Sequence, residues 1–217
     1  MADDQSLRDR LRALPVFPGE LPRFDTDATP AAPLALLVEW LEGAIAAGVL
    51  QPHAMSLATA TTSGIPSNRT LLLKDVDAEA VWFASLSTGP KGADLAANPH
   101  VALALYWREQ GRQIRITGDA EPGPRDTSAR DFLQRTSTAR ARAIAGSQSE
   151  PVADFDAHLA PALARVEADP EFAPESWVAY RVIPSSVEFW QAERERDQVR
   201  LRYRRTGATW TKEILWP

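Results

Sequence analysis

Cysteine is absent from this 217-residue sequence, and histidine occurs only three times, as His53, His100 and His158. Without cysteine the chain has no disulfide bonds, no thiolate metal ligands and no cysteine nucleophile. The three histidines lie far apart, and none belongs to a His-x-x-His or His-Glu-x-x-His motif. We therefore expect no metal centre.

Long apolar runs and an excess of positive charge are missing as well. No apolar stretch approaches the roughly 18–20 residues that cross a bilayer, and the acidic first residues lack the apolar region of a secretory signal. A formal net charge of -5 argues against a general nucleic-acid-binding protein, which usually carries a basic domain. We expect a cytoplasmic protein with neither membrane nor nucleic acid as a partner.

The prolines separate a short N-terminal arm from the rest of the chain. Pro15, Pro18, Pro22 and Pro30 interrupt the polar first 30 residues, which favours an arm or a partly ordered lead-in. The remaining residues are numerous enough for one domain with a substantial core. We find no internal repeat and predict a single domain over residues 31–217.

The periodicity of apolar residues predicts a mainly β chain with added helices. Helices are expected at residues 31–49, 91–97, 125–146 (two pieces, broken near 136–138) and 154–168. Strands are expected at residues 56–61, 67–74, 81–86, 101–107, 113–120, 176–183, 187–190, 199–205 and 209–215. Sequential strands with short connections and inserted helices indicate an antiparallel barrel with decorating helices.

The most informative stretch places a cation at each end of a buried strand. Arg69 and Lys74 bracket the four residues Thr70, Leu71, Leu72 and Leu73, and charges at both rims invite an anion. In a regular strand residues five apart point to opposite faces. Both cations therefore reach one ligand only if the strand is bulged or if Lys74 extends from its end. The alternative is that both are solvated rim charges.

Further cationic and amide groups follow in a characteristic order. They are Lys91, the Arg112-Gln113 pair, the Gln148-Ser149 pair, and Trp190 with Arg196 and Arg200. Alone, each has an ordinary explanation: a solvated lysine, a loop, a core tryptophan. Together, from about residue 34 to 217, they resemble the pyridoxamine 5'-phosphate oxidase family, flavoenzymes that hold FMN in a split β-barrel dimer. The resemblance implies an antiparallel, Greek-key-like split barrel and a homodimer with FMN at the subunit interface.

The resemblance also implies which residues bind FMN, whose phosphate needs cations and whose ring needs an apolar wall. Lys91 matches the family lysine at a helix start, although Pro90 stands where the family usually has an arginine. Trp190 supplies the flat apolar wall. The complete implied set is Arg69, Thr70, Leu71, Leu72, Leu73, Lys74, Ser85, Lys91, Gln113, Gln148, Ser149, Trp190 and Arg200.

The substrate half of the site departs from the family pattern. The family holds the phosphate of a vitamin B6 substrate with a lysine, a tyrosine, an arginine and a serine. Lys74 and Arg135 match, whereas Asp131 and Ala139 replace the tyrosine and the serine. The substrate-facing Arg-x-His becomes Arg196-Asp-Gln198, and we assign Arg196 and Gln198 the catalytic positions. Because Asp131 would repel a phosphate dianion, we expect a different substrate.

Three phrases resemble the branch of the family that acts in phenazine biosynthesis: 105–109, 148–150 and 200–203. We predict an FMN-dependent oxidase that removes two electrons from a small anionic aromatic or dihydroaromatic substrate and reduces O₂ to H₂O₂. One alternative is a genuine pyridoxine/pyridoxamine 5'-phosphate oxidase that makes pyridoxal 5'-phosphate. Another is a flavin-binding protein without turnover. A third is a barrel that holds a deazaflavin or haem, and the scarcity of histidine disfavours haem.

Overall fold

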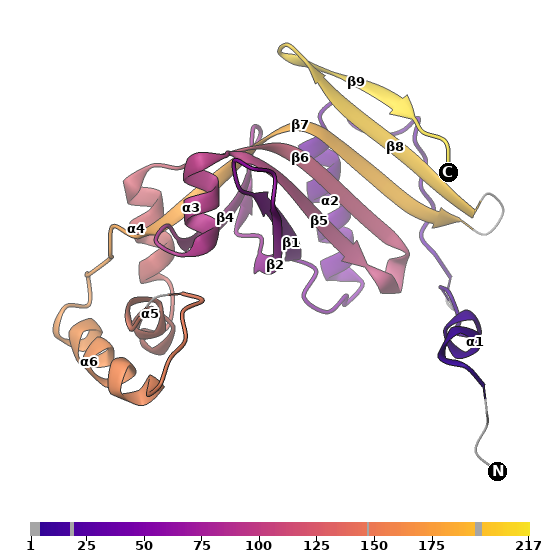
Figure 1. Ribbon diagram of the computed structural model, residues 1–217. Helices are drawn as coiled ribbons and strands as arrows, with labels where there is room; N and C mark the ends of the chain where they lie inside the picture. Colours follow the sequence, from indigo (N-terminus) through magenta and orange to yellow (C-terminus); the bar gives the residue numbers. More distant parts are fainter. Residues whose placement is uncertain (1–4, 18–19, 147, 194–196) are drawn as a thin grey trace.

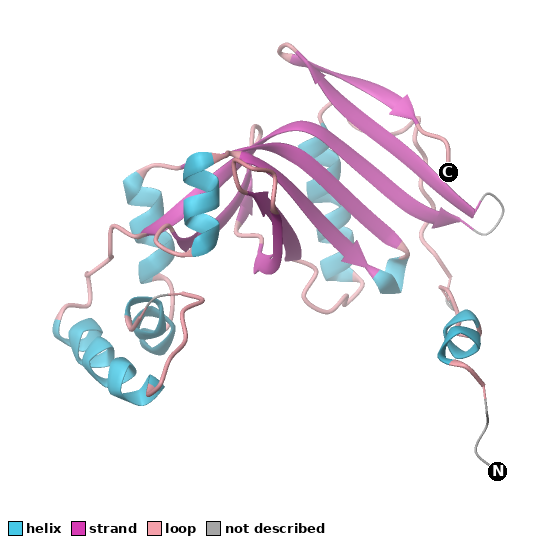
Figure 2. Ribbon diagram, in the orientation of Figure 1, coloured by secondary structure: helices cyan, strands magenta, loops and turns pink. Residues whose placement is uncertain are grey.

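The protein, described here by a computed structural model, is built on one curled, nine-stranded antiparallel sheet (Figures 1 and 2). The structure describes residues 5–17, 20–146, 148–193 and 197–217. Along the sheet the strands run β2-β1-β5-β6-β7-β4-β3, with β8 pairing with β7 and β9 pairing with β8. The described residues contain no helix that is long and apolar enough to cross a membrane.

The strands are β1 (Ala54–Ala60), β2 (Pro66–Leu72), β3 (Asp75–Val76), β4 (Val81–Leu86), β5 (His100–Trp107), β6 (Arg112–Pro122), β7 (Trp177–Glu193), β8 (Asp197–Thr206) and β9 (Thr209–Ile214). The helices are α1 (Leu7–Arg12), α2 (Pro33–Ala46), α3 (Pro90–Ala97), α4 (Arg125–Leu133), α5 (Ser137–Ile144) and α6 (Phe155–Ala168), with a 3₁₀ turn at Arg108–Gln110. The mainly β class and the break in the 125–146 helix are confirmed.

Strand β7 pairs with β4, β6 and β8, and its length differs from the prediction. The sequence suggested two strands, 176–183 and 187–190, because Pro184 and two serines stand between them. The structure joins them, since a register shift at Thr117/Gly118 of β6 absorbs the irregularity. Gly118 is required there, because a Cβ would lie 2.1 Å from the carbonyl oxygen of Ile183. The first half of β7 pairs with β4 and the second half with β8.

The core forms where α2 lies against one face of the sheet. Leu37 and Ala44 of α2 are fully buried, and Trp40 packs edge-on to Phe189 of β7 at 5.1 Å. Leu201 and Tyr203 of β8 point into the same core, as expected for alternate residues of a strand. The residues between them therefore lie on the opposite face, which is the face that carries part of the candidate site.

Two local predictions were incomplete. The N-terminal arm contains the short helix α1, which begins where the Ser6 hydroxyl accepts a hydrogen bond from the Asp9 amide at 3.2 Å. Strand β2 ends at Leu72 rather than at residue 74. The backbone turns there, and the Lys74 amide donates to the carbonyl of Trp82 at 2.8 Å. Lys74 thus extends from the end of the strand, which was one of the two options open to it.

Helices α4, α5 and α6 gather at the β4 end of β7, whereas the β8–β9 hairpin extends at the other end (Figure 1). Arg140 of α5 anchors this helical group. It is 6% exposed, and its Nη2 donates to the carbonyls of Pro170 at 2.6 Å and Phe172 at 2.9 Å. The guanidinium also lies 5.5 Å from the ring of Phe132.

Replacing Arg140 with alanine is expected to lower the free energy of unfolding by about 2–4 kcal/mol, because two backbone carbonyls lose a charged donor and a buried side chain loses its packing. Urea denaturation of the purified variant measures this. Arg142→Ala, two positions along the same helix but exposed, serves as the control and should change stability by less than about 0.5 kcal/mol. Equal stability of Arg140→Ala and the wild type would show that the anchor is unimportant.

Candidate active site

A buried, uncompensated cation marks the first half of the candidate site. Lys91, in the first turn of α3, is only 5% exposed. Its ammonium donates to the Ser85 hydroxyl of β4 and to Oε1 of Gln148 at 3.0 Å. It forms no ion pair with a carboxylate in the described ranges. Burial, and secondarily the charge of Arg69, lower the pKa of Lys91 to about 8.

The side chain of Gln148 passes close to Gly89 and contacts Lys91. The turn that carries Gln148 follows α5, and a Cβ on Gly89 would lie 2.8 Å from Oε1 of Gln148. Ser149, beside it, has φ 73° in an exposed turn and makes no side-chain hydrogen bond among the described residues. The predicted Ser85, Lys91 and Gln148 are therefore brought together, while Ser149 shapes the turn through its backbone.

Arg69 belongs to the same half and is held by its own neighbours. Its Nη1 donates to the Thr59 hydroxyl at 2.9 Å and to the Leu57 carbonyl at 3.2 Å. The buried Thr59 in turn donates to Oδ2 of Asp94 at 2.7 Å, and Asp94 lies on the same helix as Lys91. Burial lowers the pKa of Arg69, and the charge of Asp94 opposes that shift. Thr59 and Asp94 thus orient a cation toward the Lys91 region.

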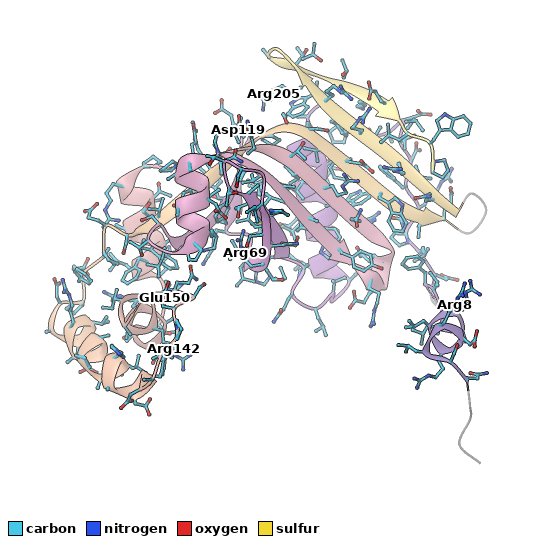
Figure 3. All side chains as sticks on the ribbon, viewed as in Figure 1. Arg8, Arg69, Asp119, Arg142, Glu150 and Arg205 are labelled. Carbon is cyan, nitrogen blue, oxygen red and sulfur yellow. The ribbon has the colours of Figure 1, made fainter. Side chains whose placement is uncertain are left out.

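A cavity of about 720 Å³ opens beside Lys91. Strands contribute Leu71, Leu72, Ser85 and Trp177 to its lining. The other lining residues come from α5, α6 and the segments around them, and include Arg135, Arg142, Gln148, Glu150, Phe155 and His158. Figure 3 shows Arg142 and Glu150 beside α5, and Arg69 among the strands. Of the other two residues in the predicted strand, Thr70 is exposed, and Leu73 is part of the core.

Four of the predicted substrate-binding residues form a group next to the cavity, and Arg135 is the one that lines it. Lys74 Nζ lies 3.2 Å from Oδ1 of Asp131. Arg135 stands over the indole ring of Trp177 at 4.3 Å and donates to the carbonyl of Ala139 at 3.1 Å. Ala139 thus contributes its backbone oxygen rather than a side chain. Burial lowers the pKa of Arg135, and the charge of Asp131 opposes this.

A cross-strand row makes the second half of the candidate site. Gln113 of β6 pairs with Trp190 of β7, which pairs with Arg200 of β8. All three point away from the core. The indole nitrogen of Trp190 donates to Oε1 of Gln198, and the ring packs against Phe17 of the N-terminal arm at 5.9 Å. Arg196, predicted to be catalytic, lies outside the described residues.

Arg200 forms an ion pair with Glu188, a partner that the sequence did not suggest. Its Nε and Nη2 donate to Oε1 of Glu188 at 2.9 and 2.7 Å, and its Nη1 donates to the carbonyl of Trp216 at 3.0 Å. Glu188 is 8% exposed. Arg200 is therefore a held residue, not a free cation, and any contact with a ligand uses its remaining donors.

The two halves of the candidate site lie far apart along strand β7 of one chain. Ser85 pairs with Val178 of β7, and Trp190 is twelve residues further along the same strand. At about 3.3 Å per residue this separation reaches about 40 Å. Figure 1 shows the same arrangement, with α3 and the helical group toward one end of β7 and β8 at the other. On this spacing we expect a single flavin to contact only one of the two halves of a given chain.

Sequence reasoning missed the residues that support the predicted ones. Thr59 and Asp94 hold Arg69 in place, and Glu188 holds Arg200. Arg142 and His158 line the cavity. Glu188 could have been found, because it stands next to the aromatic pair Phe189-Trp190 and shares a face with Arg200 once the hairpin register is known. Nothing in the sequence signals the others, since their roles depend on contacts between distant segments.

An antiparallel split barrel with a buried cation beside a cavity and a separate aromatic half defines the class of FMN-binding split-barrel proteins. The chain matches the pyridoxamine 5'-phosphate oxidase family over residues 41–168, and the pyridoxine 5'-phosphate oxidase C-terminal dimerisation region over residues 177–217. It is 39% identical over 193 residues to the pyridoxine/pyridoxamine 5'-phosphate oxidase of Granulibacter bethesdensis, covering 85% of this chain and 91% of that protein. The protein of Thermosynechococcus vestitus with the same name is 40% identical, over 82% of this chain and 85% of that one.

Among solved structures, PhzG from Burkholderia lata, in complex with tetrahydrophenazine-1-carboxylic acid, superposes with a TM-score of 0.85 at 36% identity, over 92% of this chain and all of that one. An FMN-binding protein from Nostoc punctiforme, with a TM-score of 0.72 and 17% identity over 87% of this chain and 100% of that one, shares the fold. The chain belongs to the pyridoxamine 5'-phosphate oxidase family, whose members are flavin-dependent oxidoreductases with FMN as the cofactor. The buried Lys91, which has no carboxylate partner among the described residues, fits the phosphate of such a group.

Proposed function

We propose that this protein is a homodimeric FMN-dependent oxidase whose substrate is a small anionic aromatic or dihydroaromatic compound other than a vitamin B6 phosphate. When bound, FMN supplies the two-electron chemistry by which two hydrogens of the substrate reach O₂ and leave as H₂O₂. The observation that carries the proposal is the charge arrangement beside the cavity: Lys91 has no carboxylate partner among the described residues, whereas Lys74 is already paired with Asp131.

The residues divide into three tasks. Lys91, Arg69 and Ser85 would hold the phosphate, with Gln148 closing over the same pocket. Gln113 and Trp190 would contact the ring, one through its amide and the other through its flat face. Arg135 would orient the substrate anion at the cavity wall, and Arg196 with Gln198 would face the substrate from the other half.

The homodimer follows from the separation of the two halves. Because Lys91 and Trp190 cannot reach one flavin within a chain, a complete site requires the first half of one subunit and the second half of its partner. The family's dimerisation region covers β7, β8 and β9, which carry the aromatic half. This supports an interface in which two equivalent sites form by a two-fold axis.

We expect a panel of reduced substrates to separate the candidates. In anaerobic stopped-flow mixing, a dihydrophenazine carboxylate should bleach the flavin absorbance at least tenfold faster than pyridoxamine or pyridoxine 5'-phosphate at equal concentration, a difference of about 1.4 kcal/mol or more in the activation barrier. Rapid bleaching by a B6 phosphate at micromolar concentration would instead assign the protein to pyridoxal 5'-phosphate synthesis. Failure of every compound to bleach would favour a flavin-binding protein without turnover.

The pyridoxal 5'-phosphate function is the second candidate. It is favoured by the relatives named pyridoxine/pyridoxamine 5'-phosphate oxidase, which are 36–40% identical over most of their length. The replacements Asp131, Ala139 and Gln198 at positions that would hold or face the B6 substrate weigh against it, because they remove two hydroxyl donors and add a negative charge. The panel described above decides between the two.

A further inference from the structure

The carboxylate of Asp131 is fixed from both sides at the edge of the cavity. Its Oδ1 lies 3.2 Å from the Lys74 ammonium, and its Oδ2 accepts a hydrogen bond from the indole nitrogen of Trp177 at 2.8 Å. Its side chain is 16% exposed, whereas that of Lys74 is 36% exposed. Each oxygen therefore has its own partner, and the two contacts together hold the carboxylate in place.

Arg135 completes this group by standing over the face of the same indole. Its guanidinium lies 4.3 Å from the ring centre of Trp177, and its Nε is buried without a hydrogen-bond partner among the described residues. Lys74, Asp131 and Arg135 together carry a single positive charge. Without Asp131 they would carry two.

We propose that Asp131 determines the charge of the substrate: by pairing with Lys74 it withdraws that lysine from recognition, so that Arg135 alone binds a singly charged carboxylate. This inference rests on the proposed function and names its selecting residue. A phosphate dianion would find only one unpaired cation and would bring its second negative charge close to the carboxylate of Asp131, so this group is less favourable for it. A carboxylate matches the charge and suits the planar guanidinium.

The test uses two aromatic ligands that the enzyme cannot oxidise, titrated into the FMN-loaded protein by calorimetry. They are 4-deoxypyridoxine 5'-phosphate, which carries a dianion, and phenazine-1-carboxylate, which carries a single charge. The wild type should bind the carboxylate at least tenfold more tightly. In Asp131→Asn the phosphate affinity should rise by at least about tenfold, because the repulsion is lost and Lys74 is released. The carboxylate affinity should change less than threefold.

A double-mutant cycle assigns the effect to Lys74. Lys74→Met alone should weaken the binding of both ligands, because Asp131 loses its counter-charge, whereas Lys74→Met added to Asp131→Asn should abolish the gain in phosphate affinity. Asparagine retains an oxygen that can accept from Trp177, so the local fold is preserved, and circular dichroism verifies this. Asp126→Asn, on the exposed face of the same helix α4, is the matched control and should have no effect.

Two outcomes would overturn the inference: unchanged phosphate affinity in Asp131→Asn, or a gain in phosphate affinity that persists when Lys74→Met is added to Asp131→Asn. Both readouts measure binding rather than turnover. If no dihydroaromatic substrate were oxidised in the stopped-flow panel, the proposed activity would fail, while the cycle would still report whether Asp131 selects the ligand charge.

Discussion

Replacing Lys91 with methionine is expected to weaken FMN binding at least a hundredfold while making the cofactor-free protein more stable. The ammonium is 5% exposed and has no carboxylate partner among the described residues, so burying it costs free energy until an anion arrives. Methionine has a similar shape without the charge. We expect a gain of about 1–3 kcal/mol in the unfolding free energy of the cofactor-free protein and a loss of about 3 kcal/mol in FMN binding.

The pH dependence gives this prediction a second readout. The pKa of Lys91 is about 8 in the folded protein against 10.5 ordinarily, so between these values the unfolded chain binds more protons. The cofactor-free wild type should therefore gain stability as the pH rises from 8 to 10.5. Its FMN affinity should fall over the same range, because the phosphate binds the protonated lysine.

Both trends should be absent in Lys91→Met, which fluorescence titration of FMN and urea denaturation at several pH values would measure. Lys212→Met, at an exposed position of β9, is the control and should retain wild-type FMN affinity and both trends. Wild-type FMN affinity in Lys91→Met would remove this lysine from the cofactor site.

Much of the fold could be predicted because the elements depend on local patterns. The alternation around Leu201 and Tyr203 predicted which face of β8 carries Arg200, and the turn after Thr206 predicted the hairpin to β9. The division of β7 into two strands was wrong, because Pro184 is an obstacle only in a strand without a bulge opposite it. The glycine that permits the bulge, Gly118, lies on another strand, and the sequence does not reveal that the two will meet.

The sequence predicted several residues that the structure brings together, but it did not predict which of them form ion pairs. The order of Arg69, Lys91 and Trp190 identifies the family, and the structure brings Arg69, Ser85, Lys91 and Gln148 together. That Lys74 is paired and Lys91 is not depends on which helices pack beside each residue. Asp131 was expected only to repel a phosphate. The structure adds that it also engages Lys74, and this couples the two residues in a way that no local pattern contains.

Dimers built from two differently damaged chains are expected to recover an intact site. Let one chain carry Arg69→Ala with Lys91→Met, and the other Trp190→Ala with Arg200→Ala. Neither should bind FMN alone, because each homodimer lacks one half of both sites. Heterodimers purified through two different tags should contain one site in which both halves are intact. We expect about one FMN per two chains and about half of the wild-type activity.

The reverse arrangement should give the opposite result and is the decisive comparison. When all four substitutions are placed in one chain and its partner is wild type, each of the two sites receives one damaged half, so FMN binding should be lost completely. If instead each site were built within a single chain, the wild-type subunit would keep its FMN in this second heterodimer, and the first heterodimer would bind none. FMN content measured by absorbance in the two purified heterodimers therefore distinguishes a site built from two subunits from a site built within one subunit. The separation of Ser85 and Trp190 along β7 is the reason why we expect a site built from two subunits.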